Sequence, residues 1–426
     1  MHNNPALTSD LMERVCEPGN LREAYRQVVS NRGAAGVDRM TVDELAAWAA
    51  KNSQLLRKSL LDETYRPQLI RGVDIPKPSG GTRTLGIPTV VDRWVQQAIL
   101  QVLQPLCDPT FSDHSYGFRP RRSTHQAIKK AQGYAAEGFR FVVDMDIEKF
   151  FDRVNHDILM ARLAKRLQDK RLLRLIRRFL TAGMMQEGLA STKREEGMPQ
   201  GSPLSPLLSN ILLDDLDKEL ERRGHRFVRF ADDCNVYVRS REAAERVLNS
   251  LTRWLTSRLQ LKVNQTKSAA DWAAKRKFLG YRITGKQLWV APESVARLKE
   301  KLRQLTKRRS PNKIEDTVKK LNQLIVGWVN YFRLASAKSL LEPIDHWLRR
   351  RIRCLKLHQL KRNYPRVVFL RGRGISGNNA WQTMKSGKGL WRLAMTPVVN
   401  VAMNLEWFKQ MGLVSLTQRY LEVKEV

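Results

Sequence analysis

Three aspartates stand in strand-like, apolar surroundings, where a carboxylate is costly. Asp232 and Asp233 interrupt FVRFADDCNVYVRS (227–240), and Asp146 lies near the end of FRFVVDMDI (139–147). Adjacent carboxylates repel each other and take up protons unless a cation lies between them. Mg²⁺ is held by one or two protein carboxylates while phosphates and water complete its coordination, and two such ions support in-line phosphoryl transfer. A simple hairpin turn is the alternative for ADDC, but it leaves Asp146 unexplained.

The net charge of the chain predicts a polyanionic partner. Lys and Arg number 76 against 42 acidic residues, which gives a net charge of +34 and a pI of about 10.5. The segment from Lys275 to Arg371 holds 26 basic and 6 acidic residues, so +20 of this charge lies in under a quarter of the sequence. Self-repulsion at this level opposes compactness unless a partner neutralises it. We therefore expect nucleic acid as the partner, ahead of an acidic membrane.

The elements that must position the aspartates can be predicted from hydrophobic periodicity. Helical spacing covers most of residues 1–65 and 92–106, and a β-hairpin with a basic tip is expected within 71–88. A strand at 139–147, the strand pair at 227–240 and a strand at 277–283 alternate with helices, which indicates an α+β fold with helices packed on one face of an antiparallel sheet. Three amphipathic, basic helices are expected after about residue 290.

Several classes of protein are excluded by what the sequence lacks. No apolar run reaches the length of a membrane span, and the first residues, MHNNPALTSD, have no signal-peptide pattern, so a cytoplasmic location is expected. The four cysteines are scattered and include no CxxC pair. A zinc site or a disulfide framework is therefore not expected, and we predict four reduced, packed thiols (Cys16, Cys107, Cys234 and Cys354).

Several stretches, in order along the chain, resemble the motif blocks of group II intron reverse transcriptases. They are IPKPSGGTRTLGIPT (75–89), SYGFRPRRSTHQAI (115–128), VDMDIEKFFDRVNHD (143–157), GMPQGSPLSPLLSNILLDDLD (197–217), RFADDCNVYVRS (229–240), KFLGY (277–281) and QLIVGWVNYFR (323–333). The resemblance implies a right-hand polymerase with fingers and palm, followed by an α-helical thumb or maturase domain. It divides the chain into an RNA-binding N-terminal extension (1–65), fingers and palm (66–285), a thumb/maturase domain (286–365) and a basic, DNA-binding-like region (366–426).

The resemblance also implies roles for the aspartates. Asp146, Asp232 and Asp233 match the catalytic carboxylates, and together with Ile147 they are the implied ligands of two Mg²⁺ ions, for which Mn²⁺ can substitute. Asp144 does not match and is expected to neighbour the site. Phe230 stands where the family usually has tyrosine, so altered fidelity or template contacts are expected without loss of catalysis.

Two further groups of residues follow from the same resemblance. The implied nucleotide-binding residues are Lys77 and Arg83 at the triphosphate, Phe151 as a steric gate against ribose, Gln200 in the nucleotide pocket, and Lys267. The neighbouring Phe150 is expected to be an ordinary core residue. The implied primer grip is Lys277, Phe278, Leu279, Gly280 and Tyr281, in which Gly280 is small because the primer strand passes close by.

The resemblance predicts an RNA-directed DNA polymerase that also assists splicing and retrohoming of its intron in a bacterial cytoplasm. Its expected partners are an RNA template, a primer duplex, dNTPs and group II intron RNA. The oligomeric state stays open, with a homodimer as one alternative. A host-serving relative in DNA repair or defence, and a non-catalytic RNA-binding maturase, are the alternative functions. Residues after 371 show no endonuclease pattern of His/Asn residues and paired cysteines, so we expect no cleavage of a target strand.

Overall fold

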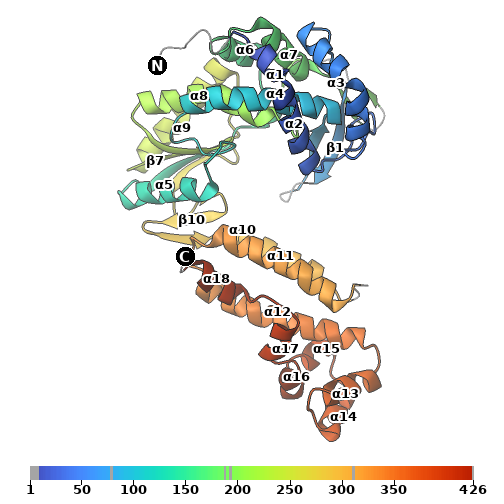
Figure 1. Cartoon of the computed structure of the whole chain (residues 1–426). Helices are drawn as coiled ribbons and strands as arrows, with labels where there is room; N and C mark the ends of the chain where they lie inside the picture. The colour runs from blue at the N-terminus through green and yellow to red at the C-terminus, as the bar shows by residue number, and fades with distance from the viewer. Residues whose placement is uncertain (1–8, 77–79, 187–188, 191–193, 309–311, 425–426) are drawn as a thin grey trace. The chain divides into compact units, whose positions relative to one another are not determined.

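The computed structural model describes residues 9–76, 80–186, 189–190, 194–308 and 312–424. The chain divides into two compact units, Met1–Trp272 and Ala273–Val426, and each is described by itself. Among the described residues, helices and strands alternate in the first unit, and helices dominate the second (Figure 1). None of the described helices combines the length and the apolar character that crossing a membrane requires.

Four helices form the N-terminal part of the first unit. They are α1 (Leu11–Val15), α2 (Pro18–Ser30), α3 (Leu45–Leu61) and α4 (Val90–Cys107). Pro18 lies in the first turn of α2, where its missing N–H is not needed, and the Thr89 side chain caps α4 by accepting from the Asp92 N–H. The Trp94 ring meets Tyr25 and Trp48 edge to face, which joins the three longer helices in one apolar cluster.

A small sheet carries the expected hairpin. Strands β1 (Ile70–Pro76) and β2 (Thr82–Ile87) pair antiparallel, β4 (Met184–Gln186) runs parallel to β1, and β5 (Leu189–Ala190) pairs with β4. The base of the hairpin is well paired, from Arg71 opposite Ile87 to Pro76 opposite Thr82. Lys77, predicted at its tip, lies outside the described residues.

The central sheet has the strand order β6-β7-β3-β8 and is antiparallel throughout. Its strands are β3 (Phe141–Met145), β6 (Arg226–Phe230), β7 (Asp233–Val238) and β8 (Ala269–Trp272). We predicted 277–283 as the closing strand, and this was wrong: β8 pairs with β3, while 277–283 lies in the second unit. The segment is also not a single strand: positive φ values at Leu279 and Gly280 turn the chain, so that Lys277–Phe278 and Tyr281–Thr284 pair as a hairpin.

Helices cover both faces of the central sheet, whereas we expected them on one. On one face, Val143 and Val236 join the main core with α8 (Ser205–Arg222) and α9 (Arg241–Leu259). The opposite face meets α5 (Thr124–Ala136), whose Tyr134 ring lies 5.8 Å from the ring of Tyr237 (Figure 1). Residues alternate between faces along a strand, so both faces of these strands are buried.

The remaining elements of the first unit connect the sheet to the N-terminal helices. They are α6 (His156–Ala164), α7 (Lys170–Thr181) and two short 3₁₀ turns, η2 (Asp108–Thr110) and η3 (Phe150–Asp152). Asp169 caps α7 through the N–H groups of Arg171 and Leu172, and it also accepts from the Met12 N–H (2.8 Å). One buried carboxylate therefore fixes α1 against the start of α7.

The second unit begins with a three-stranded antiparallel sheet followed by helices. The strands are β9 (Lys277–Phe278), β10 (Tyr281–Thr284) and β11 (Gln287–Val290), in the order β11-β10-β9. The three predicted amphipathic helices are α10 (Pro292–Leu305), α11 (Ile314–Phe332) and α12 (Lys338–Gln359). Their leucine and isoleucine faces are buried, and most of their Lys and Arg side chains are not.

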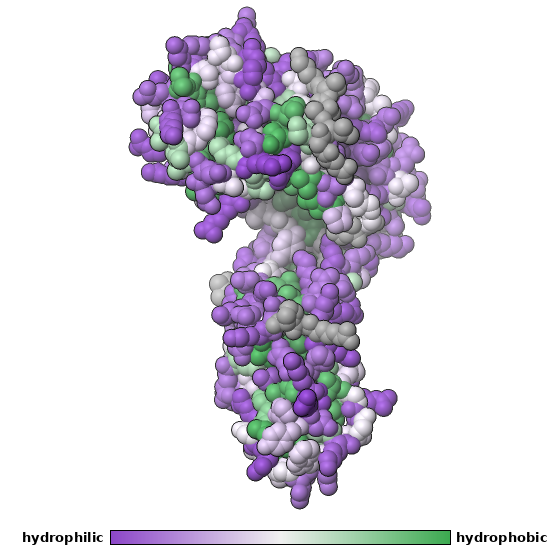
Figure 2. Space-filling model, turned by 90° about the vertical axis from the view of Figure 1, so that its right-hand side faces the viewer, coloured by the Kyte–Doolittle hydropathy of each residue, from purple (hydrophilic) through white to green (hydrophobic). Residues whose placement is uncertain are grey.

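Six shorter helices follow α12 in the described part of the second unit. They are α13 (Asn363–Arg371), α14 (Gly377–Lys385), α15 (Leu390–Leu393), α16 (Pro397–Ala402), α17 (Leu405–Gln410) and α18 (Leu416–Lys424). Asp345 of α12 caps α18 by accepting from the N–H groups of Leu416 and Thr417. The face of the molecule in Figure 2 is mainly hydrophilic, as the composition predicts. All four cysteines are buried and free, as expected.

Candidate active-site cleft

The paired aspartates occupy a hairpin tip. Phe230 and Asp233 pair across β6 and β7, so Ala231 and Asp232 form a two-residue connection. Ala231 has a φ of 58°, in the left-handed region that usually calls for glycine in such a turn. The simple-turn interpretation was thus correct in geometry. A simple turn does not account for the position of the carboxylates, because this turn (Phe230–Asp233, called the FADD turn below) lies beside the end of β3, which Asp146 follows.

The central sheet brings Asp146 to the same end as the FADD turn. Met145, the last residue of β3, pairs with Cys234 of β7, and Asp146 follows immediately. Asp144 lies two residues earlier, on the same face of β3, and pairs with Asn235. Four carboxylates therefore lie at or near the ends of two neighbouring strands.

Burial and neighbouring carboxylates raise the pKa of Asp232 and of Asp233. Burial raises the pKa of Asp232, and the charge of Asp146 raises it further. Desolvation by the surrounding protein, followed by the charges of Asp232, Asp144 and Asp146, raises the pKa of Asp233 to about 7, although this side chain still reaches solvent. Near neutral pH, the cluster is therefore receptive to a proton or to a cation.

Asp146 is held by the segment that follows α9. Its N–H donates to Ser268 Oγ (3.0 Å), and its carbonyl accepts from the Asn264 N–H (2.8 Å). Lys267 Nζ lies 3.5 Å from Asp146 Oδ2. The sequence places Lys267 near the nucleotide only by resemblance, and it offers no role for Ser268. In the structure, Ser268 anchors the Asp146 backbone over a separation of 122 residues.

A cleft of about 1310 Å³ opens at this end of the sheet. Seven of the predicted site residues line it: Arg83, Asp146, Ile147, Phe151, Gln200, Asp232 and Lys267. Asp233 and Asp144 are not among the described residues of its lining. Ile147 has a hydrocarbon side chain, which is buried, so only its main-chain carbonyl could ligate a cation. Residues far apart in the sequence thus share one concave, largely polar surface.

The two neighbouring phenylalanines have different environments. Both contribute to the lining of the cleft, but Phe150 is buried in the main core, whereas Phe151 is only partly buried. Their rings meet edge to face at 5.2 Å. The Phe151 carbonyl accepts from the Met198 N–H (2.6 Å), which connects this turn to the loop before α8.

Gln200 joins the loop before α8 to the hairpin sheet. Its carbonyl accepts from the Gly86 N–H of β2 (2.8 Å). The next residue, Gly201, has a φ of 119°, and a Cβ there would lie 2.7 Å from the Gly86 carbonyl oxygen. This close backbone approach explains the glycine and fixes the base of the hairpin beside Gln200. Arg83, on β2, is exposed and reaches the same cleft.

Phe118 is a cleft residue to which we assigned no role from the sequence. Its side chain is 47% exposed, its φ is 58°, and it lines the cleft together with Asp232. The preceding Gly117 packs against the FADD turn so closely that a Cβ would lie 2.2 Å from the Ala231 nitrogen. The signal was present in SYGFRPRRS, where an aromatic residue follows glycine in an otherwise polar loop.

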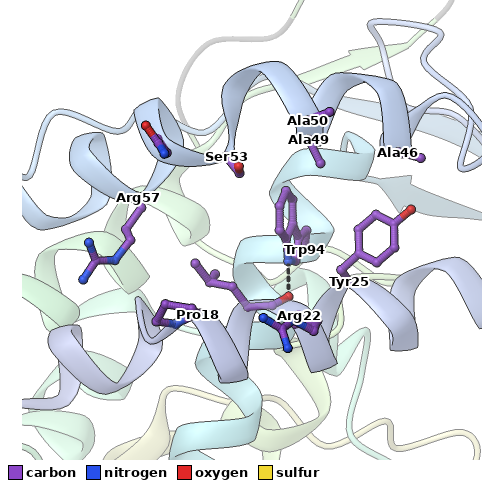
Figure 3. A pocket seen from close by; sticks show the side chains of 11 residues that line it. Pro18, Arg22, Tyr25, Ala46, Ala49, Ala50, Ser53, Arg57 and Trp94 are labelled. Atoms are coloured by element: carbon purple, nitrogen blue, oxygen red, sulfur yellow. Dashed lines mark hydrogen bonds between the residues drawn. The ribbon is translucent and has the colours of Figure 1, made fainter.

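A second cavity, of about 490 Å³, lies between α2, α3 and α4. Figure 3 shows Trp94 and Tyr25 beneath the alanines of α3, with the Trp94 ring N–H donating to the Leu21 carbonyl (2.7 Å). Arg22 and Arg57 stand at its edge. Among the described residues that line this cavity none is a carboxylate, so it does not share the chemistry of the first.

The donor set of the first cleft fits a hard divalent cation. Within the described part of the chain, no three His, Cys, Asp or Glu side chains are close enough to hold a metal ion by themselves. That result is compatible with Mg²⁺, which takes one or two protein carboxylates and completes its coordination with phosphates and water. Asp146 and Asp232 supply carboxylate oxygens in one cleft, and their repulsion favours a bound cation.

Comparison with known sequences identifies two domains. Residues 75–283 match reverse transcriptase (RNA-dependent DNA polymerase), and residues 295–372 match the group II intron maturase-specific domain. The chain belongs to the group II intron reverse transcriptase and maturase family. This confirms the resemblance and the fold class. The finer division into four domains given above stays a prediction.

Three relatives illustrate the membership. Protein YkfC of Escherichia coli K12 is 39% identical over 219 residues, which are 50% of this chain and 57% of YkfC. The group II intron-encoded protein LtrA of Lactococcus lactis is 38% identical over 198 residues, or 46% of this chain and 32% of LtrA. The putative COX1/OXI3 intron 2 protein of Saccharomyces cerevisiae is 30% identical over 258 residues, 59% of this chain and 29% of that protein. The matched part of the chain thus spans about half or less of these relatives.

Membership in this family implies nucleic-acid partners and the use of divalent metal ions. Reverse transcriptase and maturase domains imply nucleic-acid partners, in agreement with the net charge of +34. Reverse transcriptases as a family generally use divalent metal ions, in agreement with the carboxylate cluster.

The predicted primer grip forms the first hairpin of the second unit. Lys277 and Phe278 make β9, Leu279 and Gly280 form the turn with φ values of 51° and 81°, and Tyr281 begins β10. Lys277 is exposed, whereas Phe278 and Tyr281 are buried. Any contact of this hairpin with a primer would therefore use Lys277 and the turn.

The packing within the second unit gives Gly280 a reason to be small. A Cβ at this position would lie 3.1 Å from Ser294 Oγ and 3.2 Å from the Phe332 ring. The Gly280 carbonyl also accepts from the Ala291 N–H (2.9 Å). We attributed its size to a passing primer, but internal packing together with the positive φ is sufficient.

Proposed function

We propose that this chain is an RNA-directed DNA polymerase that extends a primer with dNTPs on an RNA template. The observation that carries the proposal is the cleft, which gathers Asp146, Asp232, Arg83, Gln200 and Phe151 from separate segments. Carboxylates, a cation and a polar amide on one surface suit a nucleoside triphosphate at a primer end. The domain match at 75–283 supports the same reaction.

The carboxylates of the cleft would bind the metal ions. Asp146, Asp232 and Asp233, with the main-chain carbonyl of Ile147, would hold divalent cations, Mg²⁺ or Mn²⁺. When bound, such ions supply charge neutralisation for the attacking and leaving oxygens. Lys267, 3.5 Å from Asp146, balances part of the carboxylate charge.

The remaining cleft residues would bind the nucleotide. Arg83 would contact the triphosphate oxygens, a role that the sequence extends to Lys77. Gln200 would line the pocket near the sugar 3′-OH, because its loop is fixed to both β2 and Phe151. The Phe151 ring would lie beneath the sugar and exclude a ribose 2′-OH.

We further propose that the second unit binds template–primer phosphates and group II intron RNA. The segment from Lys275 to Arg371 carries 26 basic residues, and the match of residues 295–372 to the maturase-specific domain supports a role in intron splicing and retrohoming. The hairpin Lys277–Tyr281 would contact the primer strand. A non-catalytic maturase is not favoured, because the carboxylates are present and share a cleft. A host-serving enzyme would be distinguished by the absence of catalytic intron RNA around its gene.

The direct test is primer extension by the purified full chain. With Mg²⁺, dNTPs and a DNA primer annealed to RNA, we expect a complete copy of the template. Replacement of dNTPs by rNTPs should give little extension. Template binding without any dNTP incorporation, in either Mg²⁺ or Mn²⁺, would support the non-catalytic maturase instead.

The affinity for a template–primer duplex should depend steeply on salt. A protein that contacts 6–10 phosphates loses roughly 10³–10⁵-fold in affinity between 50 and 200 mM salt, because bound counterions are released. We expect a loss in this range, measured by fluorescence anisotropy of a labelled RNA–DNA duplex. A flat salt dependence would contradict the proposal that basic helices of the second unit bind the duplex.

Phe118 is proposed as a stacking platform for a nucleobase in the cleft. Stacking of a base on an aromatic side chain is worth roughly 1–3 kcal/mol, so Phe118→Ala should weaken binding by about 5- to 150-fold. The affected step identifies the base: a higher KM for dNTP indicates the incoming nucleotide, and a higher Kd for RNA indicates the template.

Phe118→Tyr should retain the wild-type values, because it keeps the ring. The matched control is Trp272→Ala, since Trp272, at the end of β8, is a similarly exposed aromatic residue (46%) and is not among the described residues that line the cleft. Equal effects of Phe118→Ala and Trp272→Ala would contradict a specific role for Phe118.

A further inference from the structure

A fully buried arginine lies directly beside the FADD turn. Arg229, in β6, and its partner Asp217, in α8, both have side chains with no exposed surface. Arg229 Nε donates to Asp217 Oδ1 (2.7 Å) and Nη2 donates to Oδ2 (2.5 Å). This bidentate arrangement is the strong form of an arginine–carboxylate pair. The charge of Arg229 is therefore balanced from α8.

The other N–H groups of Arg229 are also satisfied. Nη1 donates to the Ala231 carbonyl (2.9 Å) and to Asn210 Oδ1 (3.0 Å), and Nη2 donates to Ser115 Oγ (2.8 Å). A guanidinium has five N–H donors in a planar fork, and here each has an acceptor. A lysine at this position could not reach the same set, because its three donors share one nitrogen.

The contact with Ala231 matters because this residue is strained. A left-handed φ costs a residue with a Cβ roughly 1–2 kcal/mol, and Ala231 adopts a φ of 58°. Its carbonyl is held by Arg229, and its nitrogen packs against Gly117, where no Cβ would fit. Asn210 Nδ2 donates to the Gly117 carbonyl (2.9 Å), so both sides of the turn depend on one network.

We propose that Arg229 is a positioning residue, which acts with Asp217 to hold the Ala231 turn and thereby the carboxylates of Asp232 and Asp233. Arg229 itself touches neither substrate nor reacting atoms. The effect of Arg229 on catalysis rests on the proposed function. The constraint that Arg229 places on the turn can be measured without it. Loss of the network should lower the rate of the chemical step more than the affinity for template–primer.

The chain offers a matched control one turn earlier on α8. Asp214, like Asp217, has a carboxylate with no exposed surface and takes part in ion pairs, here with Arg166 and Lys218. The Asp214 carboxylate accepts from those two cations, and neither of them belongs to the FADD turn. Asp217→Asn and Asp214→Asn therefore both neutralise a buried carboxylate of the same helix, and only the first weakens the hold on Ala231.

The test compares these two variants in the full chain. We expect Asp217→Asn to lower the single-turnover rate constant of dNTP incorporation by about 10–100-fold, as is typical of residues that orient a catalytic ligand. Its Kd for template–primer should stay within about twofold of wild type, by the counterion argument. Asp214→Asn should keep the wild-type rate constant even if its Tm falls as far as that of Asp217→Asn. Equal losses of rate at equal losses of Tm would show a merely structural role and overturn the proposal.

Arg229→Lys is the second variant, because it keeps the buried charge for Asp217. It should fold and bind template–primer, yet it should show the same 10–100-fold lower rate constant as Asp217→Asn. A wild-type rate constant in Arg229→Lys would also overturn the proposal.

Hydrogen–deuterium exchange of residues 229–234 needs no activity. It should be faster in Arg229→Lys and Asp217→Asn than in Asp214→Asn or wild type. If wild-type protein incorporates no dNTP, the proposed function fails while this comparison still decides whether Arg229 constrains the turn.

Discussion

Asp146→Asn should lower dNTP incorporation on an RNA template by about 10³-fold or more, whereas Asp144→Asn should stay within about tenfold of wild type. Both residues lie on the same face of the β3 end, two positions apart. Asp146 lines the cleft with Asp232, and Asp144 instead pairs with Asn235 of β7. The large loss of incorporation is therefore expected for the aspartate that lines the cleft, and not for every carboxylate near the end of β3.

The measurement is single-nucleotide extension under single-turnover conditions, with RNA affinity determined in parallel. The double change Asp232→Ala with Asp233→Ala should abolish incorporation and leave RNA binding nearly intact, because the duplex is bound by basic residues elsewhere. If Asp144→Asn were as inactive as Asp146→Asn, the assignment of the third carboxylate would be wrong. Unchanged incorporation in the double variant would remove the catalytic assignment altogether.

Phe151→Val should relax discrimination against rNTPs by about 10–200-fold, the range in which a pocket distinguishes small steric differences. The Phe151 ring lines the cleft, and its backbone is fixed by the Met198 N–H. A smaller side chain would leave room for a ribose 2′-OH without moving the carboxylates. The measurement is the ratio of kcat/KM for dGTP and GTP on one RNA template.

Phe150→Leu is the control for this prediction. Phe150 is adjacent, aromatic and buried in the main core, so its replacement should lower the Tm and leave the selectivity unchanged. Equal discrimination in Phe151→Val and wild type would make Phe151 a packing residue only. A similar loss of selectivity in Phe150→Leu would show that the effect arises from general loosening of this turn.

The residues with chemistry could be found from the sequence because their signals are local. Two adjacent aspartates in an apolar strand pair, and a third at the end of another strand, are conspicuous in a short window. Hydrophobic periodicity likewise predicts the hairpin at 71–88 and the three basic helices, because it depends on neighbours within one or two turns. The predicted helix at 92–106 corresponds to α4, which the structure extends by one or two residues at each end.

Strand pairing could not be predicted in the same way. We expected the 277–283 segment in the central sheet, but β8 is the strand that pairs with β3 there. Which strand pairs with which depends on contacts between distant segments, and a local pattern carries no information about the partner. Gly280 illustrates the same limit, since its neighbours Ser294 and Phe332 are distant in the sequence.

The sequence by itself determined which side chains can do chemistry here: the three carboxylates, the aromatic Phe151 and the cations around them. Only the tertiary structure decided how they are held. Ser268 anchors Asp146 across 122 residues, Gly117 leaves room for Ala231, and Arg229 joins α8 to the FADD turn. The physical reason is that a buried charge or a strained turn is stable only when its partners are in place, and the fold supplies those partners from distant segments.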